Sequence, residues 1–211
     1  MDIVYQDERI VVAIKPAGVI STDVRNGMPE LLRRQLHTDC IRTVHRLDAP
    51  VSGLMVLARS SRAAAEISAQ IRDGAFSKAY LAVLRGVPQE MSGELIDLLG
   101  RDRERRMTYV AAAPGKGVQE ARLRYEVLAA RDGLSLVRVE LLTGRTHQIR
   151  VQFASRGLPL AGDRRYGSPG DLLSPIALWS AHLSFRHPET GAEMTFDRQP
   201  PAIPPWDVFG I

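Results

Sequence analysis

The sequence has a single cysteine, three lysines and no long hydrophobic run. Because Cys40 stands alone, an internal disulfide and a cysteine-based metal cluster are excluded. No apolar stretch approaches the roughly 20 residues that span a bilayer. The N-terminal stretch "MDIVYQDERI" carries early acids where a secretory signal has an apolar region. We therefore expect a cytoplasmic protein that does not associate with membranes.

Arginine carries nearly all of the positive charge. The formal net charge is +4, and the lysines are limited to positions 15, 78 and 116. Arginines cluster in residues 101–106 of "GRDRERRM" and adjoin at Arg164 and Arg165. Arginine suits bidentate contact with phosphate, so these clusters favour a polyanionic partner. The alternative is that each cluster is a solvated loop, since Asp102 and Glu104 partly neutralise the first one.

The length and composition predict one domain over residues 1–211. The chain is 45% hydrophobic and shows no repeat, low-complexity segment or linker. The apolar spacing predicts helices over 28–37, 60–74 and 146–157, with Ser60 or Ser61 capping the second helix and Thr146 capping the third. Strand-like runs predict a hairpin over 2–16, strands over 78–86, 120–130 and 134–142, and a hairpin over 181–196. Without regular βαβ alternation, the fold class is α+β, with a mixed, largely antiparallel sheet and flanking helices.

The stretch "TVHRLDAPVSGLMVLA", Thr43 to Ala58, places charged residues before a strand-like apolar run. Asp48 follows Arg46 in this loop, Pro50 stiffens it, and Gly53 allows a close backbone approach. An Asp in such a loop is most often a turn residue. A carboxylate held rigidly before a buried strand is also a reasonable nucleophile or general base, and its charged neighbours favour that interpretation.

A second stretch, "TGRTHQIRV", runs from Thr143 to Val151. Arg145 is expected at the start of a helix, where a cation opposes the helix dipole, and such conflicts often mark functional sites. His147 and Arg150 are three apart, so both can face the same side of that helix. The alternative is that these side chains only cap a loop, fill the core or lie on the surface.

Lys78 and Tyr80 lie two apart in the strand-like "SKAYLAVLRG", so they share a face. An isolated Tyr in a strand is usually a core residue, whereas in a protein that binds nucleic acid its ring can stack on a base. The five histidines show no metal-ligand spacing, and neither a Walker A loop nor a dinucleotide-binding motif occurs. No metal or cofactor is predicted.

These stretches together resemble the RluA-type RNA pseudouridine synthases. The likeness rests on "VHRLDAPVSGLMVLA", "SKAYLAVLRG", "LLTGRTHQIRVQFASRGLPLAGDRRYG" and "LSFRHPETG", with "VAIKPAGV" near the start, and it covers almost the whole chain. The resemblance implies the pseudouridine synthase fold and an isomerase that converts uridine in ribosomal or transfer RNA to pseudouridine, without metal or cofactor. It also implies a single catalytic domain without the S4-type RNA-binding module of some relatives, and we expect a monomer.

The resemblance further implies the roles of individual residues. Asp48 is the expected catalytic aspartate, which either attacks the anomeric carbon or removes the C2′ proton. Tyr80 is expected to stack on the base, and Arg145 to pair with Asp48. Arg46 resembles the arginine that fills the gap left by the flipped nucleotide. The remaining expected substrate-binding residues are Lys78, His147, Gln148 and Arg150.

Two departures and two alternatives qualify these expectations. Val51 stands where many relatives have Thr, and Trp179-Ser180 where many read His-Ala, so substrate preference can differ. The first alternative is a catalytically silent RNA-binding protein of the same fold. The second is a glycoside-cleaving hydrolase that pairs Asp48 with a second carboxylate, Asp163 or Asp23.

Overall fold

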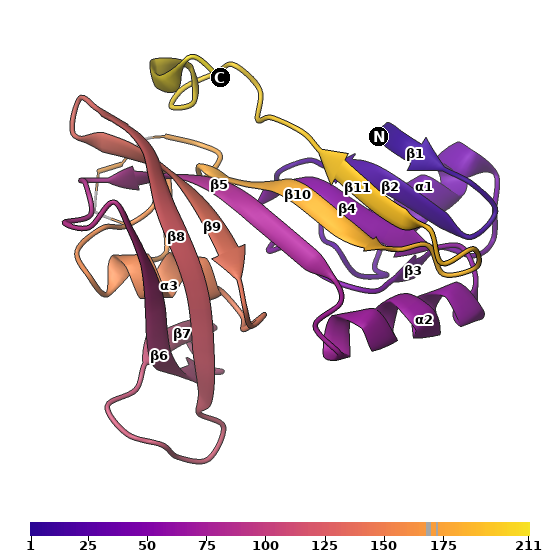
Figure 1. Ribbon diagram of the computed structural model, residues 1–211, viewed down its shortest axis with the longest axis horizontal. Coiled ribbons are helices and arrows are strands. Elements are labelled where there is room, and N and C mark those ends of the chain that lie inside the picture. The colour runs from indigo at the N-terminus through magenta and orange to yellow at the C-terminus, as the bar shows by residue number, and fades with distance from the viewer. Residues whose placement is uncertain (168–169, 172) are drawn as a thin grey trace. The chain divides into compact units, whose positions relative to one another are not determined.

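The computed structural model describes the chain except residues 168, 169 and 172. It forms two compact units (Figure 1). The first unit comprises Met1–Lys78 and Trp179–Gln199, and the second comprises Ala79–Leu178 and Pro200–Ile211. Two of the three unit boundaries fall inside strands, β5 (Ser77–Arg85) and β10 (Leu178–Arg186), and the third follows Gln199. The single domain expected from the sequence stays a prediction.

The first unit is built on a short, mixed sheet. Its other elements are β1 (Asp2–Gln6), β2 (Ile10–Lys15), α1 (Met28–Leu36), β3 (Arg42–Thr43), β4 (Ser52–Ala58), α2 (Ser61–Arg72) and β11 (Glu193–Asp197). β1, β2 and β4 pair antiparallel in that order, and β3 pairs antiparallel with the end of β4. β10 joins the start of β4 in parallel and β11 in antiparallel orientation.

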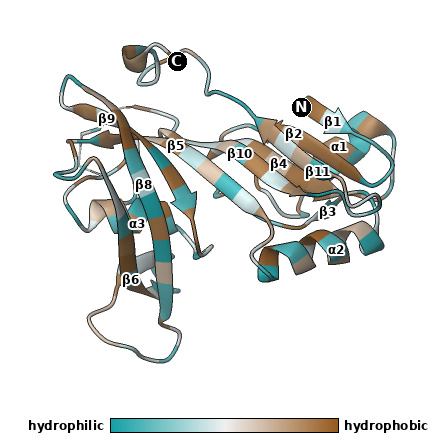
Figure 2. Ribbon diagram, viewed as in Figure 1, coloured by the Kyte–Doolittle hydropathy of each residue, from teal (hydrophilic) through white to brown (hydrophobic). Residues whose placement is uncertain are grey.

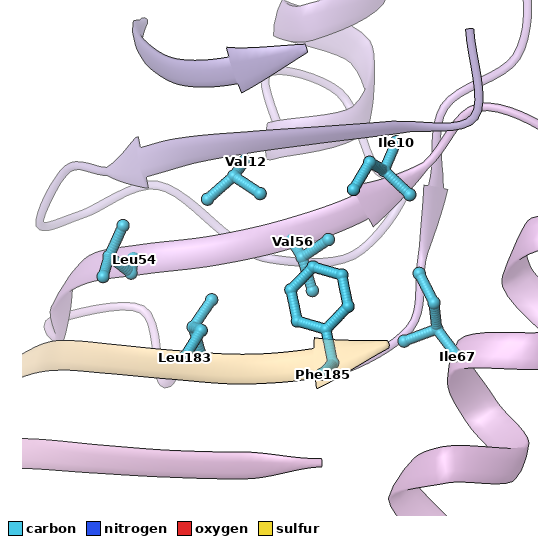
Figure 3. Packing of buried hydrophobic residues seen from close by; sticks show 7 residues of the cluster. All are labelled: Ile10, Val12, Leu54, Val56, Ile67, Leu183 and Phe185. Carbon is cyan, nitrogen blue, oxygen red and sulfur yellow. The ribbon is translucent and has the colours of Figure 1, made fainter. Parts of the chain in front are cut away.

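The core of the first unit lies between this sheet and α2. Ile67 of α2 packs with side chains of β2, β4 and β10 in one buried cluster: Ile10, Val12, Leu54, Val56, Leu183 and Phe185 (Figure 3). The intervening residues of β4, Met55 and Leu57, are fully buried as well, so both faces of this strand are covered. Figure 2 shows the resulting hydrophobic stretch along β4.

The second unit is an antiparallel sheet in the order β5, β9 (Leu134–Leu141), β8 (Gln119–Arg131), β6 (Ser92–Asp102) and β7 (Met107–Val110). β8 and β9 meet at a tight turn in which Asp132 and Gly133 have φ of 55° and 73°, the left-handed pair of a hairpin turn. The helix α3 (Gln148–Ala154) packs Val151 against Leu99 and Ala121 of the sheet.

The predicted α+β class with a mixed, largely antiparallel sheet is confirmed. Ser60 caps α2 as one of the two predicted candidates, because its side chain accepts a hydrogen bond from the Ala63 amide at 3.1 Å. The prediction that Thr146 caps the third helix is wrong: α3 begins at Gln148, and its N-cap His147 has a φ of 55° and no capping side-chain bond. The hairpin β6–β7 was not predicted. No described helix is both long and apolar enough to cross a bilayer.

Candidate active site

The loop that carries Asp48 connects β3 to β4 in the first unit. Its side chains alternate: His45 and Leu47 are buried, Arg46 is exposed and Asp48 is half-buried. The Ser21 hydroxyl makes two hydrogen bonds to the backbone of Leu47: it donates to the carbonyl at 2.6 Å and accepts from the amide at 3.0 Å. The residue before Asp48 is therefore held at both backbone polar groups.

Lys15, at the end of β2, holds the residue after Asp48. Its fully buried ammonium donates to the carbonyls of Pro16, Val19 and Ala49 at 2.9, 2.7 and 3.0 Å. Burial lowers the pKa of Lys15 to about 8, while the negative charge of Asp48 raises it in part. The role of Lys15 was not predicted; the sequence clue to it is a lysine at the end of an apolar strand.

The strand after the loop is held by a close backbone approach. Gly53 has a φ of 117°, and a β-carbon at this position would collide with the backbone of Ser180 in the parallel strand β10. No other residue type fits without moving the backbone of one strand. The Asp48 loop is thus fixed at Ser21, at Lys15 and at the start of β4.

His45 is a structural member of the same loop. Its ring is buried, its Nε2 accepts a hydrogen bond from the Val56 amide at 3.1 Å, and within the described residues its Nδ1 has no hydrogen-bond partner. Burial and the nearby charge of Lys78 lower the pKa of His45 to about 3, so the imidazole is neutral. Burial also lowers the pKa of Lys78, which is half-buried at the start of β5.

In the second unit, the stretch from Thr143 to Gln148 is organised by the amide of Gln148. Its Oε1 accepts from the Thr143 hydroxyl at 2.8 Å and from the Arg145 amide at 2.9 Å, and its Nε2 donates to the Arg122 carbonyl at 3.0 Å. Gln148 is buried, whereas Arg145 is exposed and donates from Nε to the Glu120 carbonyl at 2.9 Å. Arg145 precedes the first helical residue by three positions, so the expected conflict with the helix dipole is weak.

His147 and Arg150 meet at Tyr166. The Tyr166 hydroxyl lies 2.7 Å from Nδ1 of His147, within hydrogen-bond distance, and accepts from the Thr108 amide at 2.8 Å. The guanidinium of Arg150 lies over the Tyr166 ring, with its carbon 5.1 Å from the centroid. This aromatic junction was not predicted, because a tyrosine in the stretch "PLAGDRRYG" has no motif spacing of its own.

Arg150 also forms a buried ion pair with Asp163. Both contacts, Nε to Oδ2 and Nη2 to Oδ1, measure 2.8 Å, and the two side chains are only 5% and 0% exposed. Burial raises the pKa of Asp163, but the hydrogen bonds and charge of Arg150, with two backbone amides, outweigh it and lower that pKa. The pair fixes α3 to the loop at residues 163–167.

The predicted site residues are thus divided between the units. Arg46, Asp48 and Lys78 lie in the first, and Tyr80, Arg145, His147, Gln148 and Arg150 in the second. Tyr80 is 5% exposed on β5, opposite Val139. Among the described residues, no three His, Cys, Asp or Glu side chains gather as metal ligands would. The individual roles of these residues stay predictions.

Comparison with known proteins identifies the family. Residues 9–155 match the family model described as RNA pseudouridylate synthase. The chain belongs to this family. The resemblance to RluA-type RNA pseudouridine synthases, first seen in the HRLD and GRTHQIR stretches, is confirmed.

Relatives and solved structures agree with this assignment. The chain is 35% identical to the uncharacterized RNA pseudouridine synthase YhcT of Bacillus subtilis, over 90% of its own length and 65% of that protein's. It is 32% identical to the ribosomal large subunit pseudouridine synthase D of Zymomonas mobilis, over 95% and 69%. The structure of human RNA pseudouridylate synthase domain containing 1 matches with a TM-score of 0.83 and 27% identity, over 98% and 86% of the two chains.

Proposed function

We propose that this pseudouridine synthase family member isomerises specific uridines of RNA, with Asp48 as its catalytic residue. Tyr80 stacks on the flipped base, and Arg145 pairs with the Asp48 carboxylate. Arg46, which is exposed beside Asp48, enters the gap left in the RNA. The other substrate-binding residues are Lys78, His147, Gln148 and Arg150. The protein acts as a cytoplasmic monomer without metal or cofactor.

The observation that carries this proposal is the way in which Asp48 is held. Its two neighbours, Leu47 and Ala49, are fixed by the Ser21 hydroxyl and the Lys15 ammonium. A turn residue needs neither a buried cation nor such restraint. Restraint is what a reactive carboxylate requires, because it preserves the orientation of the carboxylate toward the reacting atoms.

The reaction that these residues would serve is an isomerisation, so no atom is gained or lost. The N1–C1′ bond of uridine breaks, the uracil rotates, and a C5–C1′ bond forms while the proton on C5 is lost and N1 gains one. The Asp48 carboxylate either attacks C1′ and leaves again, or removes the C2′ proton and later returns it. Tyr80 is a candidate for the final deprotonation at C5.

Ribosomal RNA is the first target to test. Relatives from Zymomonas mobilis and from Neisseria meningitidis, at 32% and 33% identity, are named as ribosomal large subunit pseudouridine synthases. Transfer RNA is the second target. The order of testing follows from these names, while the chemistry proposed at Asp48 is the same for both.

The contacts of the candidate second acids argue against the hydrolase alternative. Asp163 is saturated by Arg150 and two backbone amides, and Asp23 forms an ion pair with Arg33 at 2.6 Å. Neither acid is poised to protonate a leaving group or to activate water. Release of free uracil would be the sign of hydrolysis.

The test is the conversion of Asp48 to Asn. Wild-type protein is incubated with unmodified ribosomal and transfer RNA, and pseudouridine is measured by mass spectrometry of the nucleosides. We expect Asp48→Asn to abolish the product while RNA affinity stays within about threefold of wild type. Asp39→Asn, the same change at an exposed aspartate of the same unit, should keep full activity. RNA binding by wild type without product on any RNA would favour the silent RNA-binding alternative.

A further inference from the structure

The aromatic ring of Tyr109 lies across a glycine on the hairpin β6–β7. Gly100 and Tyr109 are cross-strand partners, and a β-carbon on Gly100 would lie 2.5 Å from Cζ, 2.6 Å from Oη and 2.9 Å from Cε2 of the tyrosine. Gly100 has no positive φ, so its backbone conformation does not require glycine. The close approach of the ring is what excludes a side chain there.

This ring is presented to solvent. Tyr109 remains 49% exposed although Gly100 beneath it is buried. One side of the ring is therefore covered by the backbone of β6 while the rest stays accessible. An exposed aromatic side chain held against the backbone loses little further conformational entropy when a second flat ring stacks on it.

The opposite face of the hairpin is anchored to the rest of the second unit. The Thr108 hydroxyl donates to the Thr146 carbonyl at 3.0 Å, and the Thr108 amide donates to the Tyr166 hydroxyl at 2.8 Å. The guanidinium of Arg165 donates to the Arg106 carbonyl. Because successive strand residues point to opposite faces, this anchoring of Thr108 directs Tyr109 away from the body of the unit.

The turn of the same hairpin is rich in positive charge. Three arginines of the turn, at positions 103, 105 and 106, are exposed and face only two acids in the segment, Asp102 and Glu104. Arg101 is exposed as well, but it lies in β6 opposite Thr108 and therefore shares the face of Thr108 rather than that of Tyr109. The Asp102 carboxylate is partly used by the turn itself, since it accepts from the Arg105 amide at 2.9 Å. Arg103 forms no ion pair within the described part of the chain, so its guanidinium group is available for phosphate.

We propose that the hairpin β6–β7 binds a single-stranded segment of the RNA substrate, with one base stacked on Tyr109 and the backbone phosphates on the arginines of the turn, residues 103–106. The inference rests on the proposed function for its choice of RNA. A flat ring next to phosphate-binding arginines is the combination by which proteins hold unpaired nucleotides. A duplex would not serve, because its base faces are already stacked.

Photocrosslinking gives a direct test of stacking. Full-length protein is irradiated with a single-stranded RNA dodecamer that carries 5-iodouridine, a photoactive base that crosslinks to stacked aromatic rings. After digestion with trypsin, Tyr109 is the only aromatic residue of the peptide Met107–Lys116. We expect the crosslink in this peptide. Its absence there, or a failure of the dodecamer to bind, would overturn the proposal.

Affinity measurements with matched variants give the second readout. Tyr109→Leu should weaken binding of the unmodified dodecamer by about 5- to 100-fold, the cost of one lost stack, and Tyr109→Phe should bind within about twofold of wild type. Gly100→Ala should also weaken binding, because the new methyl group displaces the ring and leaves the backbone conformation allowed. Equal affinity for wild type and Tyr109→Leu would contradict the proposal.

Two controls complete the design. Leu128→Ala removes another exposed side chain, which lies on β8 and is 46% exposed. Gln119, the β8 residue that pairs with Leu99 of β6, lies about 30 Å from Leu128 along the strand, so this substitution should leave RNA affinity unchanged. Binding is read without turnover, so loss of the proposed isomerase activity and loss of this surface are separate results. A change in oligomeric state in Tyr109→Leu would assign the ring to contacts between copies and overturn the proposal.

Discussion

Replacing Lys15 with Met tests how the Asp48 loop is held. The buried ammonium has a pKa of about 8, against 10.5 for an ordinary lysine. Below pH 8 both the folded and the unfolded chain carry the proton, and the cost of burying the charge is fully present. Between pH 8 and 10.5 only the unfolded chain keeps the proton, so the free energy of unfolding rises with pH across this window.

The size of the effect follows from the two pKa values. Between pH 7 and 10 the wild type should gain about 2.5 kcal/mol relative to Lys15→Met, because each pKa unit corresponds to about 1.4 kcal/mol. At pH 7 the variant should still be the less stable protein, since the carbonyls of Pro16, Val19 and Ala49 lose a charged donor. Asp48→Asn should lower the pKa of Lys15 further, because it removes the charge that raises it.

The assay is urea unfolding of both proteins at several pH values from 7 to 10. Other titrating groups cancel in the difference between wild type and variant. Lys116→Met, the same change at an exposed lysine, is the matched control for the loss of a lysine side chain. A difference between wild type and Lys15→Met that stays flat from pH 7 to 10 would refute the electrostatic account of this loop.

Three further substitutions probe the scaffold around the site. Asp163→Asn should cost about 3–5 kcal/mol of unfolding free energy in thermal or urea melts, because it leaves Arg150 buried without its anionic partner; a loss below 1 kcal/mol would contradict this. Between pH 8 and pH 5 the free energy of unfolding of the wild type should fall by about 2 kcal/mol, because His45 binds a proton only in the unfolded chain. His45→Gln keeps an acceptor but cannot titrate, so it should not show this loss, and parallel acid melts of the two proteins check the difference. Gly53→Ala should lower stability by about 3 kcal/mol or more, since a positive φ and the backbone of Ser180 both exclude a β-carbon, and an unchanged melting temperature would disprove it.

Sequence patterns predicted the elements whose formation is local. The apolar run from Gly53 to Ala58 forms the buried part of β4, and the Ser60 cap with Gly74 bounds α2. The turn at Asp132 and Gly133 connects the two strands predicted over 120–130 and 134–142. In each case the residues that determine the structure are neighbours in the sequence, so periodicity and turn chemistry suffice.

The missed features depend on contacts between distant residues. α3 begins at Gln148 because the amide of that residue satisfies the loop and Arg122 of β8, which no cap pattern reports. The charges in "GRDRERRM" hid the hairpin β6–β7, whose strands are held by pairing and by Tyr166. Lys15 could be given its role only after the fold brought Ala49, 34 positions away, to its ammonium.

The candidate site divides in the same way. The residue types at Asp48, Tyr80 and Arg145 could be selected from the sequence, because the HRLD, KAY and GRTHQIR stretches carry the family resemblance. The supporting contacts, such as Ser21 with Leu47, could not be, since a serine in a loop has no pattern of its own.

The central claim is that Asp48 performs the isomerisation of uridine. The most direct measurement maps pseudouridines in total RNA from cells that lack the gene and are complemented with wild type, Asp48→Asn or Asp39→Asn. Wild type and Asp39→Asn should restore the same modified position or positions, and Asp48→Asn should restore none although the protein accumulates to the same level. Restoration of pseudouridine by Asp48→Asn would contradict the account.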